Sequence, residues 1–196
     1  MAAPAYDPQP DAPEHWSEES FLELPDDRRR IELLDGGLLV SPSPGSPHQK
    51  LSSRLWYLFE RARPDDLDVF EAVNVRLGPD RILIPDLAVV DAGPGIDPDA
   101  VVWEARHVRL VVEIDRANRR RTEDQVKPAL YAAAGIGHLL RIDLTAAGPD
   151  ATGYALHEGR WVETARARPG EDLVLDAPVP LTTNLAALLA ARRLPD

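Results

Sequence analysis

Two acidic residues stand inside apolar runs that are otherwise suited only to the core of a protein. Asp86 lies in ILIPDLAVV and Glu113 lies in VRLVVEID. An isolated carboxylate is very costly to bury unless it is paired with a cation or bound to a metal. We expect both runs to form buried strands. The chain must therefore fold so that both acids find partners.

Composition indicates a globular protein with a core of its own. The chain has 196 residues, of which 44% are apolar, enough to bury most of its apolar surface. We expect the Pro- and Asp-rich residues 1–16 to be a disordered leader and residues 17–196 to form a single domain. The absence of cysteine excludes disulfides and thiolate metal sites and is consistent with the cytoplasm. We expect no targeting signal and no membrane span.

Helix and strand patterns alternate along the chain. In order, we expect a helix capped by Ser17, a hairpin at 30–42, a helix capped by Ser46 that ends near Pro64, a hairpin of long strands at 68–78 and 81–91, a strand at 107–115, a helix at 122–134 kinked by Pro128, a strand at 138–144, a hairpin at 153–165 and a helix at 184–192. This order predicts an α/β domain with a mixed central β-sheet flanked by helices.

Side-chain periodicity brings three ionisable residues within reach of each other. Period two in a strand puts Glu113 and Asp115 on one face. Period 3.6 in a helix puts Glu123, Lys127 and Tyr131 on one stripe. Two acids from neighbouring strands and a lysine from the next helix can therefore converge.

Such a set has the chemistry of a hard-cation site. Two carboxylates and a backbone carbonyl between them offer only oxygen ligands, which suit Mg²⁺ or Mn²⁺ and not zinc. A metal there lowers the pKa of a bound water and neutralises a phosphoryl group, and a lysine can stabilise the transition state. Two ordinary alternatives remain open. Asp86 can be a strand-end turn acid after Pro85, and Glu113 can form a buried salt bridge with Lys127.

Charge limits the contacts with nucleic acid without excluding them. The net charge of -11 argues against broad, unspecific adhesion, which depends on phosphate neutralisation by Lys and Arg. Basic residues nevertheless cluster at Arg28–Arg30, at Arg116 and at Arg119–Arg121. These clusters can be solvated loop arginines or phosphate contacts, and both interpretations stay open.

Four motifs follow one another over roughly residues 20–145, namely IELLDGGLLVSPSPGSPH, IPDLAVVD, LVVEI and KPALYAAAGIGHLLRID. In this order they resemble the bacterial restriction endonuclease (Uma-type) domain family of the PD-(D/E)XK nuclease superfamily. The resemblance implies a restriction-endonuclease-like core with an N-terminal helix and hairpin. It implies that Asp86 and Glu113 are catalytic acids and metal ligands and that the carbonyl of Ile114 is a third ligand. Lys127 would be the catalytic lysine relocated to a helix, because Asp115 occupies the position of the signature lysine.

The same resemblance assigns further residues. Glu32 would add an acid near the metal, and His48 would face the phosphate from a helix N-terminus. The family usually has valine, valine, serine and proline after the second acid, whereas this chain has Ile114, Asp115, Arg116 and Ala117. Arg116 would supply charge in place of the serine. The DNA contacts we expect are His48, Arg116, Arg119 and Arg120.

These expectations combine into one functional hypothesis. The protein is expected to be a cytoplasmic endonuclease that uses Mg²⁺ (or Mn²⁺) to hydrolyse DNA, and a homodimer, since symmetric cutting of a duplex favours two-fold symmetry. Two other classes stay open. One is a degenerate nuclease fold that acts as a binding or assembly module, which Asp115, Arg116 and the acidic net charge favour. The other is a hydrolase of small phosphorylated molecules.

Overall fold

The computed structural model describes residues 15–25, 30–41, 43–93, 95–97, 100–116 and 122–190. The expected leader lies almost entirely outside these residues. A mixed six-stranded sheet forms the centre, in the spatial order β11 (Arg160–Ala167), β10 (Gly148–His157), β9 (His138–Thr145), β8 (Val108–Arg116), β6 (Leu87–Asp91) and β3 (Leu67–Glu71). Its strands β8 and β9 are parallel and the other pairs are antiparallel.

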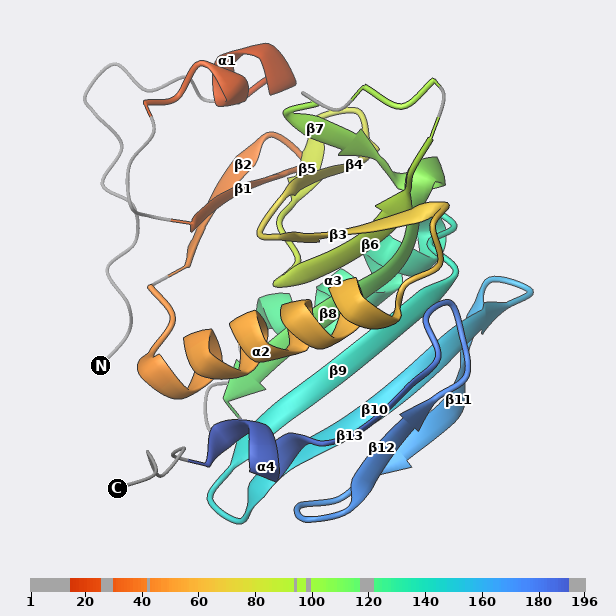
Figure 1. Ribbon diagram of the computed structural model, residues 1–196. Coiled ribbons are helices and arrows are strands. Elements are labelled where there is room, and N and C mark those ends of the chain that lie inside the picture. Colours follow the sequence, from red (N-terminus) through yellow and green to blue (C-terminus); the bar gives the residue numbers. More distant parts are fainter. Residues whose placement is uncertain are drawn as a thin grey trace.

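A second, five-stranded sheet lies beside β6 and β3 (Figure 1). Its order is β2 (Gly37–Ser41), β1 (Arg30–Leu34), β5 (Arg81–Leu83), β4 (Asn74–Gly78) and β7 (Val102–Glu104). A short 3-10 helix, Ala105–His107, joins β7 to β8. A small hairpin of β12 (Asp172–Leu175) and β13 (Leu181–Asn184), which the sequence patterns did not predict, follows the central sheet.

Helices cover both faces of the six-stranded sheet (Figure 1). Helix α2 (Ser46–Ala62) lies across one face and places Leu51, Leu55 and Phe59 in a core with α4 (Leu185–Leu189) and alternate residues of β8. Helix α3 (Thr122–Ala133) covers the other face, where Tyr131 packs in a second core. The predicted α/β class with a mixed sheet flanked by helices is confirmed.

The prediction of two long continuous strands at 68–78 and 81–91 is wrong. Each is broken into two pieces that belong to different sheets, β3 and β4 in the first case and β5 and β6 in the second. The first break is at Ala72, whose φ is 52°. The second contains Pro85, which has no backbone N–H to donate to a neighbouring strand. Strands that change sheets in this way form the corner between two packed sheets. Asp86 stands at that corner.

Local signals at helix and turn boundaries have mixed outcomes. Helix α1 (Glu18–Leu22) is capped as predicted, because the Ser17 hydroxyl accepts a hydrogen bond from the N–H of Ser20. The predicted cap of α2 is wrong, since Gly45 is the N-cap and no side chain caps that end. The hairpin turn at Glu158–Gly159 is confirmed, with φ of 47° and 75°. No helix in the described part of the chain is long and apolar enough to cross a membrane.

The packing of α2 generates a stability prediction. Phe59 is fully buried against the central sheet, and its replacement by alanine leaves a cavity that should cost about 3–5 kcal/mol. Tyr57, on the same helix and 52% exposed, is the matched control, and Tyr57→Ala should change stability by no more than about 0.5 kcal/mol. Urea unfolding measures both variants. Equal losses in the two would contradict the packing described for α2.

Candidate active site

Five elements deliver ionisable side chains to the corner between the two sheets. Strand β1 provides Arg30 and Glu32, which are two residues apart and so share a face. Asp86 comes from the β5–β6 bend, and Glu113 comes from β8. Helix α3 presents Lys127 and Tyr131, which lie four residues apart on one stripe. His48 belongs to the first turn of α2.

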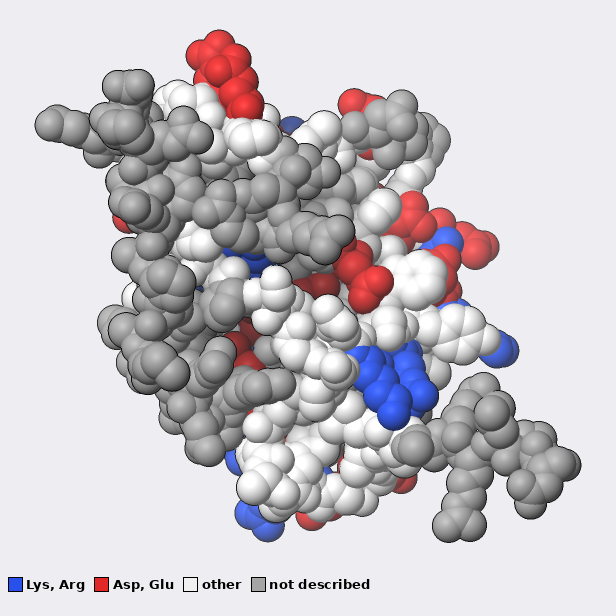
Figure 2. Space-filling model, turned by 90° about the vertical axis from the view of Figure 1, so that its left-hand side faces the viewer, with Lys and Arg blue, Asp and Glu red and all other residues white. Residues whose placement is uncertain are grey.

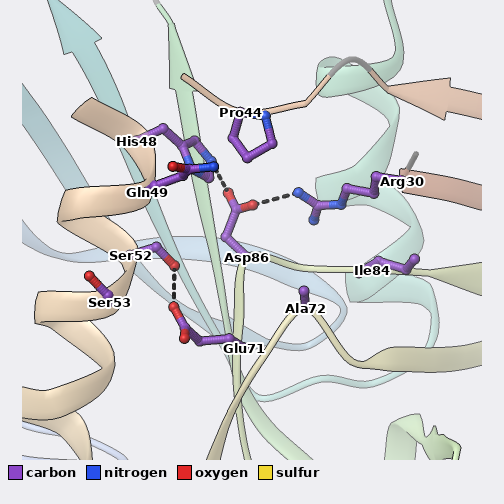
Figure 3. A pocket seen from close by; sticks show the side chains of 10 residues that line it. All are labelled: Arg30, Pro44, His48, Gln49, Ser52, Ser53, Glu71, Ala72, Ile84 and Asp86. Carbon is purple, nitrogen blue, oxygen red and sulfur yellow. Dashed lines mark hydrogen bonds and ion pairs between the residues drawn. The ribbon is translucent and has the colours of Figure 1, made fainter. Parts of the chain in front are cut away.

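Asp86 is held by three donors, of which Figure 3 shows Arg30 and His48. Arg30 Nη1 donates to its Oδ1 at 2.5 Å. Its Oδ2 accepts from the backbone N–H of Ile114 at 2.7 Å and lies 3.1 Å from His48 Nε2. Burial opposes the charged form, but the Arg30 guanidinium and the His48 hydrogen bond outweigh it and hold the pKa of Asp86 well below its usual range. Asp86 does lie in the bend before a strand, as the alternative of a strand-end turn acid expected, but it is buried and anchored by three donors.

Lys127 joins the other two acids of the cluster. Its Nζ donates to Glu32 Oε1 at 2.8 Å and lies 3.6 Å from Glu113 Oε1. The backbone N–H of Ile84 also donates to Glu32 Oε1, at 2.7 Å. Burial disfavours the ammonium ion, but the charges of Glu113 and Glu32 outweigh burial and raise the pKa of Lys127. The expected salt bridge between Glu113 and Lys127 is present, but the nearer partner of the lysine is Glu32.

A tyrosine contacts the same oxygen of Glu113 as Lys127 does. The Tyr131 hydroxyl donates to Glu113 Oε1 at 2.5 Å, and Tyr131 is fully buried. Burial raises the pKa of Glu113 to about 7, Lys127 opposes this rise, and the charge of Asp86 adds to it. Burial, followed by the charge of Glu113, also raises the pKa of Tyr131. Tyr131 therefore positions a site carboxyl in addition to filling the core.

The cluster has fewer positive charges than carboxyl groups. Glu32, Asp86 and Glu113 face the two permanent cations Arg30 and Lys127, and Glu32 Oε2 is buried without a hydrogen-bond partner. An all-carboxylate donor set with an unpartnered oxygen fits a hard divalent cation in its chemistry. Within the described residues, however, no three ligating side chains are already arranged around one ion position. Both oxygens of Asp86 are engaged by donors of the protein itself.

A cavity of about 590 Å³ opens beside Asp86. Its walls include Arg30, His48, Ser52, Glu71 and Asp86, and the Ser52 hydroxyl donates to Glu71 Oε1 at 3.1 Å (Figure 3). Its volume is that of a small-ligand site. On the face shown in Figure 2, the charged side chains of the described residues form small separate groups and no continuous basic surface. Of the three acids of the cluster, Asp86 is the one that lines this cavity.

The predicted site residues fall into three groups. The structure brings Asp86, Glu113, Lys127, Glu32 and His48 together. The side chain of Arg116 and the whole of Arg119 and Arg120 lie outside the described parts of the chain. The remaining predicted contributor, Ile114, points its backbone N–H at Asp86.

Two members of the cluster were not assigned from the sequence. Arg30 was noted only as part of a basic run, although its spacing of two from Glu32 was a signal that both share a face of β1. Tyr131 was placed on the stripe of Lys127, but its hydroxyl contact with Glu113 depends on the tertiary fold. Asp115 stands in the position of the signature lysine. Its Oδ2 lies 3.6 Å from Arg141 Nη2.

The buried pair of Glu32 and Lys127 generates a second prediction. A double-mutant cycle with Glu32→Gln and Lys127→Met should give a coupling energy of about 2–3 kcal/mol, because each single change leaves a buried group without its partner. The exposed pair of Asp150 and Arg166 is the control and should give less than about 1 kcal/mol. Denaturant unfolding of the four proteins in each cycle supplies both values. Equal coupling in the two cycles would refute the buried ion pair.

Comparison with known proteins agrees with this architecture. The structure is similar to that of a "putative nuclease belonging to DUF820" from Anabaena variabilis, with a TM-score of 0.70, 16% sequence identity, and coverage of 89% of this chain and 99% of that chain. This likeness shows a restriction-endonuclease-like fold. No curated protein matches the chain. The sequence matches the Uma2 family, described as "Putative restriction endonuclease", over residues 18–188. Because this match spans most of the chain, the protein belongs to the Uma2 family.

Proposed function

We propose that the protein is a metal-dependent endonuclease that hydrolyses DNA phosphodiester bonds. The observation that carries this proposal is the meeting of Asp86, Glu113, Glu32 and Lys127, from separate elements, in one buried cluster beside a cavity. Burying three carboxyl groups against two permanent cations opposes folding. Such an arrangement is understandable when the group serves a reaction. Membership of a restriction-endonuclease family supports the same chemistry.

Asp86 and Glu113 are the residues that would hold Mg²⁺ or Mn²⁺. When bound, such an ion lowers the pKa of a water ligand and neutralises charge on the transferring phosphoryl group. The carbonyl of Ile114 is proposed as a third ligand. In an extended strand the N–H and C=O of one residue point to the same edge, and the N–H of Ile114 donates to Asp86.

Lys127 is proposed to act as a cation and not as a base. Its pKa is raised by Glu113 and Glu32 against the effect of burial, so its Nζ keeps its proton at neutral pH. An ammonium ion can donate hydrogen bonds to the attacking water and to the phosphoryl oxygens as their negative charge grows. Glu32 assists by fixing the position of that ammonium ion through the 2.8 Å hydrogen bond.

DNA contacts are proposed for His48, Arg116, Arg119 and Arg120. His48 lies in the first turn of α2 and lines the cavity. The three arginines follow Glu113 closely in the sequence. With a net charge of -11, binding should depend on these local contacts more than on general attraction. A homodimer remains part of the proposal, since two sites related by a two-fold axis suit the two strands of a duplex.

Loss of one carboxylate charge tests the activity. Asp86→Asn should lower the rate of plasmid cleavage with Mg²⁺ or Mn²⁺ by at least about a hundredfold, the scale expected when one preorganised electrostatic group is removed. Asp91→Asn is the control, because Asp91 is the last residue of β6, the strand that begins directly after Asp86, but pairs with Arg109. The control should cleave at the wild-type rate. Equal cleavage by the Asp86 variant and the wild type would remove the assignment.

A second candidate function is a nuclease fold kept as a binding or assembly module. Two observations favour it, namely that both oxygens of Asp86 are occupied by donors of the chain and that Asp115 pairs with Arg141 where the signature lysine would stand. This candidate predicts neither metal-dependent cleavage nor metal binding. Turnover of phosphodiester dyes or nucleotides without any cleavage of DNA would instead indicate a hydrolase of small molecules.

Metal binding separates the two candidates. Calorimetric titration of the wild type with Mn²⁺ should show one stoichiometric site, and Glu113→Gln should weaken it by at least about tenfold, because a charged oxygen ligand is lost. The control is Glu163→Gln, a change on the exposed part of β11, which should leave the titration unchanged. A wild-type protein without any Mn²⁺ site would favour the binding module.

A further inference from the structure

Arg30 contacts one of the two carboxylate oxygens of Asp86, the residue proposed above as a metal ligand. Its Nη1 lies 2.5 Å from Asp86 Oδ1. The donors on the other oxygen have less freedom, because the Ile114 N–H is part of the β8 backbone and His48 is short and anchored in α2. Arg30, by contrast, reaches Asp86 on a long flexible stem from the first residue of β1. Of the three partners, the guanidinium is the one that can move away.

The rest of the guanidinium has unused hydrogen-bonding capacity. Arg30 Nε and Nη2 are buried and have no hydrogen-bond partner. Unpartnered buried donors carry a desolvation cost that a new acceptor would remove. Arg30 also lines the cavity together with His48, whose Nδ1 is likewise buried and unpartnered. The planar fork of an arginine matches two oxygens of a phosphate group.

We propose that Arg30 is a resident cation of this site, which neutralises Asp86 until a divalent cation replaces it and then binds a phosphate of the substrate through its guanidinium. The inference rests on the proposed function, since it concerns the same carboxylates and a phosphodiester substrate. It adds a phosphate-binding residue and a competition for Asp86. Arg30 should therefore weaken the binding of the metal ion and strengthen the binding of the substrate.

The competition is tested by titrating the full chain with Mn²⁺ in a calorimeter. Arg30→Met removes a charged hydrogen bond to Asp86 and should tighten Mn²⁺ binding about tenfold. Arg109→Met is the matched control, because Arg109 forms an Arg–Asp pair with Asp91 within the six-stranded sheet. The control should bind Mn²⁺ like the wild type. Unchanged or weaker Mn²⁺ binding by a folded Arg30→Met protein would overturn the competition.

The phosphate contact is tested with a DNA duplex in Ca²⁺, followed by fluorescence anisotropy at several salt concentrations. Arg30→Met should weaken duplex binding about tenfold and reduce the slope of log affinity against log salt by about 1, as expected for one lost phosphate contact. Arg30→Lys keeps the charge without the fork and should keep the slope while weakening binding. An unchanged affinity and slope in Arg30→Met would overturn the phosphate role.

The outcomes separate this inference from the proposed function. If the wild type binds Mn²⁺ and cleaves DNA but the Arg30 variants behave like it, only the role of Arg30 fails. If neither the wild type nor Arg30→Met binds Mn²⁺, both proposals fail. If only Arg30→Met binds Mn²⁺, the replacement of Arg30 by a divalent cation in the wild type is overturned. If circular dichroism shows that Arg30→Met does not fold, Arg30→Lys provides the test. Duplex binding by Arg30→Lys equal to that of the wild type would then overturn the proposal.

Discussion

The structure depends on how it compensates three carboxyl groups in its interior. Glu32 is fully buried, and Asp86 and Glu113 are almost so. Two permanent cations, Arg30 and Lys127, face them. Buried charges are tolerated when they are paired and hydrogen-bonded, and burial raises the pKa of Glu113 although the charge of Lys127 opposes this rise. The three carboxyl groups therefore outnumber the permanent cations of the cluster by one.

The fold creates this cluster by changing sheets at two points. Without the breaks at Ala72 and Pro85, the two long strands would form one flat ladder and Asp86 would lie within it. The bend leaves the backbone of Asp86 bonded to its neighbours, since its C=O accepts from Ala72 and its N–H donates to Val112, while its side chain faces the corner. The acids of β1 and β8 then approach from the two sheets. Side chains held by such a scaffold need little reorganisation.

Much of this arrangement could be predicted from sequence patterns, because periodicity reports burial and faces directly. The runs around Asp86 and Glu113 indicated buried strands, and the stripe of Lys127 and Tyr131 indicated a shared helix face. The pattern gave no signal for the break at Ala72, whereas Pro85, which has no N–H to donate in a ladder, was a signal for the second break. The link between Arg30 and Asp86 joins residues 56 positions apart, and only the tertiary fold defines it. Roles that depend on metal or DNA remain proposals.

A crystal soaked in Mn²⁺ and measured for anomalous scattering tests the central claim most directly. The account predicts a peak between the carboxyl groups of Asp86 and Glu113, with the Arg30 guanidinium displaced from Asp86 toward the cavity. A map without a peak at this position, in which Arg30 still contacts Asp86, would contradict it. The cluster would then be a closed set of ion pairs that stabilises a corner between two sheets.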